Sequence, residues 1–165
     1  MTRRALAAVA LLLLSPACVS AQTICGEQLA QSSPQDSALL AFASRAGIVH
    51  RDAFRNLADY LHDDGGRALP QCYLTKRAAE ARGWRPGDDL WRVAPGTAIG
   101  GNRFANREGL LPPQWNGRYV EVDLDYEGGH RGTHRLVFVR DMGERWLIFI
   151  STNHDGNFVA FAPSR

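Results

Sequence analysis

The sequence predicts an α+β fold, in which N-terminal helices pack on a C-terminal antiparallel β-sheet. Apolar residues recur at helical spacing in the first half of the chain, whereas in the last third they alternate with polar residues as in strands. Short turn segments join these strand patterns directly, as they do in hairpins. The 165 residues are enough for one domain with a sizeable core.

The first 21 residues have the pattern of a secretory signal peptide. Two arginines precede an apolar run, Pro16 ends the run, and small residues lead to a cleavage site after Ala21. We therefore expect a secreted protein, extracellular or periplasmic, without membrane attachment after cleavage; a buried apolar helix and a lipoprotein signal at Cys18 are the alternatives. Because cleavage removes both arginines, the formal charge falls from +2 to zero, and nucleic-acid binding would require a local cluster of cations.

Three helices are predicted in the first half of the chain. The first covers residues 37–45, the second residues 50–62 and the third residues 75–82. The second helix has one apolar face, formed by Phe54, Leu57, Ala58 and Leu61. The glycine- and proline-rich stretch that follows, residues 84–117, is predicted to be loop, with Gly100-Gly101 as one of its turns.

Cys25 and Cys72 are the two cysteines that remain after cleavage. In an oxidising compartment two cysteines most simply form one disulfide. We expect this bond to tether an N-terminal extension, residues 22–49, to the domain of residues 50–165. Two buried free thiols are the alternative.

Four strands are predicted in the last third of the chain, at residues 118–126, 134–140, 145–152 and 157–161. Side chains along the first of them point alternately to opposite faces of the sheet. One face would carry Val120, Val122, Leu124 and Tyr126, and the other Tyr119, Glu121, Asp123 and Asp125. Because helices come first and hairpin-linked strands later, the pattern argues against a parallel doubly wound sheet.

Four polar side chains would meet on one face of this sheet. Glu121 lies on the polar face of the first strand, Arg131 and Arg135 lie at the start of the second, and His154 follows the third. Taken singly, each of them is more often a solvated surface residue. Their grouping on adjacent strands predicts an acid–base site.

Lys76 is the one lysine among 19 basic residues, the others being arginine. A single lysine in a chain that otherwise uses arginine is typical of a site that needs a compact point charge, although chance explains it equally well. The sequence has no zinc signature, phosphate-binding loop or serine-hydrolase motif. His130 and His134 flank a turn and would lie too far apart to share a metal ion, so no metal site is expected.

Five segments carry a distinctive combination of residues. They are LPQCYLTK at residues 69–76, VAPGTAIGGNRFANREGLLP at 93–112, the strand at 121–126, the pair Arg131 and Arg135, and STNH at 151–154. In this combination the chain resembles the barnase family of bacterial guanyl-preferring ribonucleases. The resemblance covers roughly residues 50–161, in the same order and with small changes in length.

The resemblance implies the microbial ribonuclease fold and an enzyme that cuts single-stranded RNA after guanosine without a metal or cofactor. It makes Glu121 the general base and His154 the general acid. Three residues would surround the scissile phosphate, namely Lys76, Arg131 and Arg135, with Asp123 holding the arginines. Four would form the guanine-recognition loop, namely Phe104, Asn106, Arg107 and Glu108.

Two departures from the family pattern concern the substrate. Asp155 stands where the family commonly has a tyrosine that helps to hold the nucleotide, and Ala105 replaces a serine of the guanine loop. We expect a monomer whose partners are single-stranded RNA and a small acidic inhibitor of the barstar type. The alternatives are an interbacterial or effector toxin with the same chemistry, and a relative that binds RNA or protein without cleaving RNA.

Overall fold

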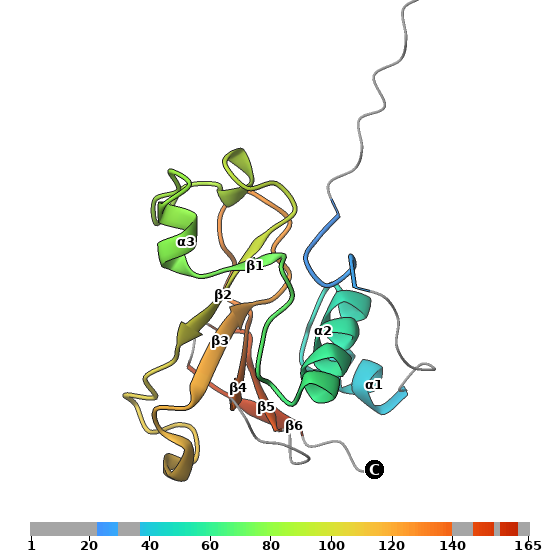
Figure 1. Ribbon diagram of the computed structural model, residues 1–165. Coiled ribbons are helices and arrows are strands. Elements are labelled where there is room, and N and C mark those ends of the chain that lie inside the picture. Colours follow the sequence, from blue (N-terminus) through green and yellow to red (C-terminus); the bar gives the residue numbers. More distant parts are fainter. Residues whose placement is uncertain (1–22, 30–36, 140–146, 154–155, 162–165) are drawn as a thin grey trace, which may run out of the picture.

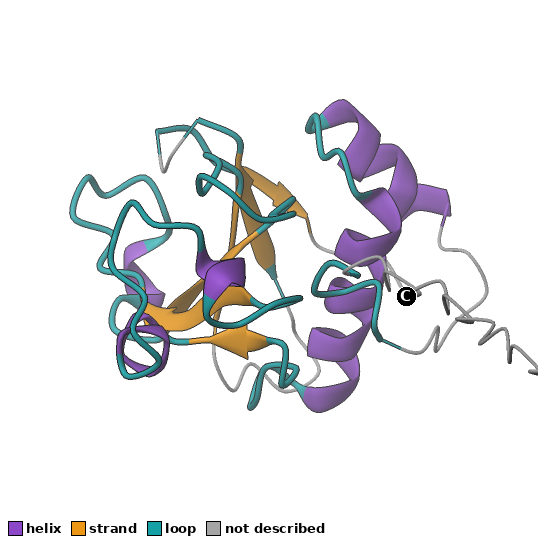
Figure 2. Ribbon diagram, turned by 90° about the horizontal axis from the view of Figure 1, so that it is seen from above, coloured by secondary structure: helices purple, strands orange, loops and turns teal. Residues whose placement is uncertain are grey.

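The computed structural model describes residues 23–29, 37–139, 147–153 and 156–161. In these ranges six strands form one sheet, in the order β1-β2-β3-β4-β5-β6. The strands are β1 Tyr73–Leu74, β2 Ala98–Arg103, β3 Tyr119–Asp123, β4 Arg135–Val139, β5 Ile148–Ser151 and β6 Val159–Phe161. The helices are α1 Ser37–Arg45, α2 Arg51–Asp64 and α3 Lys76–Glu80, with 3-10 turns at Leu90–Arg92 and Pro113–Trp115. Helices α1 and α2 lie on one side of the sheet, and α3 lies beside its β1–β2 end (Figures 1 and 2).

The sheet confirms the predicted α+β class. From β2 to β6, each strand pairs antiparallel with the strand that follows it along the chain. The two-residue strand β1 differs, because it pairs with β2 in parallel. Strands β3, β4, β5 and β6 all lie inside the ranges that the alternation pattern predicts, and each is shorter than predicted.

Strand β2 corrects the prediction of a loop over residues 84–117. Its glycines are needed for space: a Cβ at Gly100 would lie 2.7 Å from the ring of Tyr73 and 2.8 Å from a methyl group of Val122. After Gly100 the pairing with β3 shifts by a bulge, and Gly101 adopts a φ of 84°, which favours glycine. The glycine pair therefore marks a close approach within a sheet rather than a turn.

Strand β3 ends three residues earlier than predicted. Asp125 has a φ of 55°, and this left-handed conformation cannot continue an extended strand. Up to Asp123 the alternation holds. Val120 and Val122 pack with the helices, whereas Tyr119 packs with aromatic residues on the opposite face.

Each face of the sheet has its own apolar core. The face toward α1 and α2 is apolar throughout, with Val120, Val122, Leu136, Ile148 and Ile150 packed against the helices. The opposite face is apolar at one end, through Tyr119, Val137, Val139 and Phe149. By strand alternation, the other end of that face carries Glu121, Asp123, Arg135 and Ser151. The polar residues of β3, β4 and β5 therefore gather at one end of the face that the helices leave uncovered.

The end of α2 and the start of α3 are both capped, and the second cap places one candidate site residue. Helix α2 stops at Gly65, which adopts a left-handed φ of 65° as its C-cap. The side chain of Thr75 caps α3 by accepting a hydrogen bond from the backbone N–H of Ala78, at 3.1 Å. Lys76 is therefore the first residue of α3.

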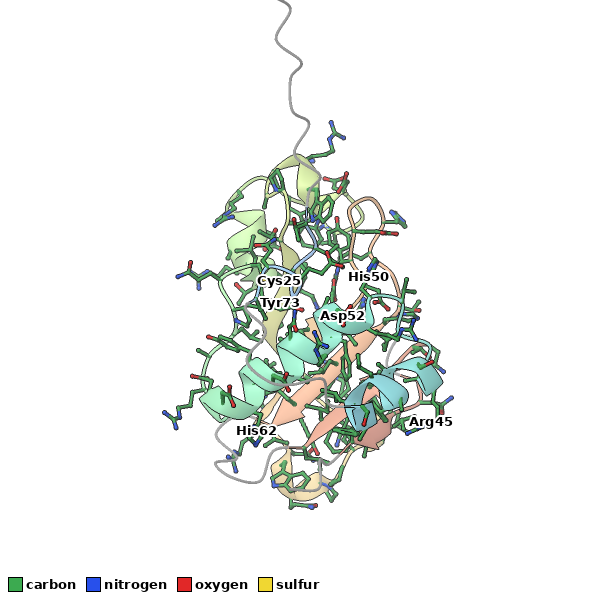
Figure 3. All side chains as sticks on the ribbon, turned by 90° about the vertical axis from the view of Figure 1, so that its right-hand side faces the viewer. Cys25, Arg45, His50, Asp52, His62 and Tyr73 are labelled. Carbon is green, nitrogen blue, oxygen red and sulfur yellow. A yellow bond between two sulfur atoms is a disulfide. The ribbon has the colours of Figure 1, made fainter. Side chains whose placement is uncertain are left out.

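Cys25 and Cys72 form the predicted disulfide, with their Cα atoms 5.4 Å apart. The bond joins residues 23–29 to the turn before β1, at the junction where Figure 3 labels Cys25 and Tyr73. Cys25 is buried there, in a cluster that includes Leu74 and Ile99. No helix in the described part of the chain is both long and apolar enough to cross a membrane.

Reduction of this disulfide should lower the free energy of unfolding by about 4 kcal/mol, because the bond closes a long loop and so restricts the unfolded chain. The two cysteines are 47 residues apart in the sequence. Urea unfolding of the oxidised protein and of a Cys25→Ser/Cys72→Ser variant measures the difference. Coincident midpoints would contradict the expected stabilisation, and alkylation of the unreduced, unfolded protein checks that no thiol is free.

Candidate active site

The polar end of the uncovered sheet face collects side chains from two strands, a loop and a helix. Strand β3 supplies Glu121 and Asp123, and the register places Asp123 directly opposite Arg135 of β4. Arg131 reaches the same point from the loop before β4, and Lys76 comes from the start of α3. These are five of the residues that the sequence and the family resemblance singled out.

Glu121 and Lys76 form an ion pair, with Lys76 Nζ 3.0 Å from Glu121 Oε1. The Glu121 side chain is only 13% exposed, while that of Lys76 is 46% exposed. Glu121 thus lies at the floor of the site with one cation above it. Because the lysine is half in water, the pair itself contributes little to stability, about 0–1 kcal/mol.

Asn102 is a residue of this site that sequence reasoning missed. It pairs with Glu121 in the sheet register, and its Oδ1 accepts a hydrogen bond from the backbone N–H of Lys76, at 3.1 Å. Its Nδ2 is buried and has no hydrogen-bond partner among the described residues. Asn102 therefore ties the start of α3 to β2 beside the carboxylate. Its signal in the sequence was hidden, because it follows the two glycines that indicated a turn.

Asp123 binds both arginines. Its carboxylate accepts two hydrogen bonds from Arg131, at 2.6 Å from Nε and 2.7 Å from Nη2, and lies 3.2 Å from Nε of Arg135. The side chains of Asp123 and Arg135 are each 4% exposed. Burial alone would lower the pKa of Arg131, but the bonds and charge of Asp123, with the charge of Glu121, raise it overall. Asp123 therefore holds Arg131 in its charged form and fixes both guanidinium groups in place.

Trp84 gives Arg131 a second support. The guanidinium carbon lies 5.9 Å from the centre of the indole ring, within the range of a cation–π interaction. The indole is almost fully buried, and its Nε1 donates to the carbonyl of Asp88 at 2.9 Å, so the ring is fixed. Sequence reasoning placed Trp84 at the start of the loop-rich stretch and assigned it no role.

His154, the predicted general acid, lies outside the described residues, as does Asp155. The chain just before it is described. Ser151 lies opposite Arg135 in the sheet, and its hydroxyl donates to Oδ1 of Asn153 at 3.0 Å. The same oxygen accepts a hydrogen bond from the backbone N–H of Asn157, at 2.9 Å. Asn153 thus links the end of β5, next to Arg135, to the backbone of Asn157.

The predicted guanine loop divides into a buried base and an exposed tip. Phe104 is buried and packs edge-to-face on Tyr119 and Phe158. Arg107 and Glu108 are exposed. The loop therefore presents Arg107 and Glu108 to solvent from a base that aromatic packing fixes.

Asn106 uses its side chain inside the loop. Its Nδ2 donates to the carbonyl of Leu111 and to Oδ1 of Asn116, both at 2.8 Å, and its Oδ1 accepts from the backbone N–H of Leu111 at 2.9 Å. It also has a left-handed φ of 47°. The amide thus holds the loop in shape.

The charges of the site suit an anion. Lys76, Arg131 and Arg135 carry three positive charges, and Glu121 and Asp123 carry two negative ones, which leaves one net positive charge. Asp123 is enclosed by its arginines, whereas Glu121 faces a half-exposed lysine and can exchange a proton with a bound group. Among the residues described, no group of three or more His, Cys, Asp or Glu side chains could hold a metal ion.

Comparisons with known proteins agree with one family. The sequence model of a family described as ribonuclease matches residues 57–162. A ribonuclease of Heyndrickxia coagulans is 41% identical over 108 residues, which are 65% of this chain and 94% of that protein. Ribonucleases of Bacillus intermedius and Bacillus pumilus are also 41% identical over 108 residues, which are 63% of each of those proteins.

Proposed function

This chain belongs to the ribonuclease family, and on that premise we propose that it is a secreted, metal-independent endoribonuclease that cleaves single-stranded RNA, preferentially after guanosine. The observation that carries the proposal is the ion pair of Glu121 with Lys76 beside the Asp123–Arg131–Arg135 cluster. It puts one carboxylate beside three cations, and phosphodiester cleavage by acid–base catalysis uses such a base and such charges together with a general acid, which we assign to His154.

In the first step the RNA provides its own nucleophile. Glu121 takes the proton of the 2′-hydroxyl, the 2′-oxygen attacks phosphorus, and the bond from phosphorus to the 5′-oxygen breaks. Protonated His154 gives its proton to that departing oxygen. The products are a 2′,3′-cyclic phosphate and a 5′-hydroxyl. Water then opens the cyclic phosphate with the two roles exchanged, and the 3′-phosphate is left.

The cations act on the phosphate. As the 2′-oxygen attacks, negative charge gathers on the non-bridging oxygens of phosphorus. Lys76, Arg131 and Arg135 favour that state over the ground state because the arginines are fixed by Asp123 before the substrate binds. DNA lacks the 2′-hydroxyl, so we expect it to bind without being cut.

Guanine recognition is assigned to the loop of residues 104–109. Guanine offers N1–H and an exocyclic amine as neighbouring donors, and the exposed carboxylate of Glu108 can accept from both. The loop backbone, which the Asn106 side chain holds in shape, can reach O6. That edge of the base is free only in unpaired RNA, which supports a single-stranded substrate.

Secretion is proposed from the N-terminal pattern and the disulfide. Residues 1–21 have the arrangement of a signal peptide, and the bond between Cys25 and Cys72 is typical of an oxidising compartment. The monomeric state stays a prediction. The small acidic inhibitor is also a prediction, which the cationic site supports because an acidic protein would fit that surface.

Digestion of a defined RNA in the presence of EDTA tests this function. We expect fragments that end in guanosine, with 2′,3′-cyclic phosphates that appear first and 3′-phosphates that follow. The matching DNA oligonucleotide serves as the control and should stay intact. A requirement for a divalent ion would overturn the mechanism, and equal cleavage after all four bases would overturn the guanine preference alone.

A further inference from the structure

Besides Glu121 and His154, the chain has another acid–histidine pair, which lies just beyond the paired ends of β3 and β4. Asp123 and Arg135 are the last registered pair of β3 and β4. One step further, the backbone N–H of Leu124 donates to the carbonyl of His134, at 3.1 Å. The next step is made by side chains, since His134 Nδ1 lies 2.5 Å from Asp125 Oδ2. This pair closes the base of the loop, residues 126–133, from which Arg131 extends.

Asp125 fixes that base to the helix layer. Its Oδ1 accepts a hydrogen bond from the backbone N–H of His50 at 2.8 Å, and its Oδ2 accepts one from Val49 at 3.1 Å. His50 immediately precedes α2, as Figure 3 shows. A carboxylate is favourable at this end of a helix because the helix dipole is positive there. The left-handed conformation of Asp125 turns the chain out of the sheet and toward α2.

His50 adds a weaker tie to the same loop. Its Nε2 lies 3.4 Å from Oε2 of Glu127, and its Nδ1 lies 4.0 Å from Oε1 of Glu27. The side chain of Glu127 is 70% exposed, so this contact contributes little on its own. The pair of Asp125 and His134 is buried more deeply, and it fastens the loop together with Tyr126, whose hydroxyl accepts a hydrogen bond from the backbone N–H of Leu90 at 2.9 Å.

The segment next to His134 contacts both halves of the proposed machinery. Nη1 of Arg135 donates to the carbonyls of His134, at 2.7 Å, and Gly132, at 2.9 Å. The hydroxyl of Thr133 donates to the carbonyl of Thr152 at 2.7 Å, two residues before His154. These three contacts use backbone carbonyls or the Thr133 hydroxyl, so they remain when the His134 side chain is truncated. The His134 ring itself acts on the loop of Arg131, through its contact with Asp125.

We propose that His134 is a positioning residue for RNA cleavage: by binding Asp125 it holds the loop that aims Arg131 at the scissile phosphate. The inference rests on the proposed function, since it takes the phosphate role of Arg131 as given. His134 itself touches no reacting atom. It acts through the arginine, and its loss should therefore cost little once the arginine is gone.

A double-mutant cycle between His134 and Arg131 tests this inference. The substrate is a dinucleoside phosphate with guanosine on its 5′ side, and kcat/KM is measured for His134→Ala, Arg131→Ala and the double variant. We expect His134→Ala to lower kcat/KM about 10- to 100-fold in the otherwise unchanged protein. In the Arg131→Ala background we expect the same substitution to cost less than about twofold, because coupled residues are non-additive.

A conservative variant shows whether the effect of His134 comes from its bond to Asp125 or only from the volume of its side chain. The Nδ2 of asparagine can stand where histidine Nδ1 stands, so His134→Asn should bind Asp125 and recover most of the activity that His134→Ala loses. His62→Ala, at the exposed far end of α2, is the matched control and should keep full activity. Urea unfolding of every variant shows whether each is folded under the assay conditions.

The outcomes distinguish the two proposals. If the unsubstituted protein does not cleave RNA, the proposed function fails and this inference falls with it. If the protein cleaves RNA but His134→Ala costs the same factor with and without Arg131, only the positioning role of His134 is wrong. The role is equally wrong if His134→Asn is as impaired as His134→Ala.

Discussion

Asp123→Ala should lower the free energy of unfolding by about 3–5 kcal/mol, because it leaves Arg135 buried without its carboxylate. Asp123 and Arg135 are each only 4% exposed, so water cannot replace the lost partner without opening the sheet end. The substitution also frees Arg131, which donates to Asp123 at 2.6 and 2.7 Å. Urea unfolding at neutral pH measures the loss of stability.

The same variant should lose activity beyond its loss of stability. In the fraction that stays folded, we expect kcat/KM to fall about 100-fold, since the arginines no longer converge on one point. Asp123→Asn retains the shape and one acceptor oxygen. Its kcat/KM and its stability should lie between those of Asp123→Ala and those of the unsubstituted protein. Asp88→Ala removes an exposed carboxylate and serves as the control, with an expected change within about 0.5 kcal/mol. An unfolding midpoint of Asp123→Ala equal to that of the control would refute the structural role.

The parts of the fold that sequence predicted well are those with local causes. Helix α2 has an apolar face and a glycine stop, and β3 has a clean alternation, so both were placed within a few residues. Strand β2 was missed because its glycines serve a contact that is distant in the chain, between Gly100 and the side chains of Tyr73 and Val122. A close approach of this kind leaves the same letters in the sequence as a turn.

The candidate site shows the same division. Strand alternation was enough to put Glu121 and Asp123 on one face, and the family resemblance added Lys76, which the structure places 3.0 Å from Glu121. The sequence could not show that the side-chain amide of Asn106 forms its hydrogen bonds within its own loop. Nor could it pair His134 with Asp125, because that contact depends on where β3 ends and on the hairpin register.

Glu121→Ala should abolish most activity and leave stability almost unchanged. Losing a general base costs about two to four orders of magnitude in rate. The lysine that it leaves unpaired is 46% exposed and is simply solvated, so we expect a change in stability of about 1 kcal/mol or less. This result would be the opposite of that for Asp123→Ala, although the two carboxylates are only two residues apart. Glu121→Gln keeps the shape and should be as inactive, whereas full activity of both variants would exclude Glu121 as the base.

His154→Ala should reduce cleavage of RNA by a similar factor, but for a reason that a second substrate reveals. A general acid is needed only because the departing 5′-oxygen is a poor leaving group without a proton. A guanosine 3′-phosphodiester with a nitrophenolate leaving group needs no such proton, so His154→Ala should cleave it nearly as fast as the unsubstituted protein does. Glu121→Ala should stay inactive on it, because the 2′-hydroxyl must still lose its proton. Equal impairment of both variants on this substrate would show that His154 does not act as the acid. Activity of His154→Ala alone would assign protonation of the leaving oxygen to His154 and deprotonation of the 2′-hydroxyl to Glu121.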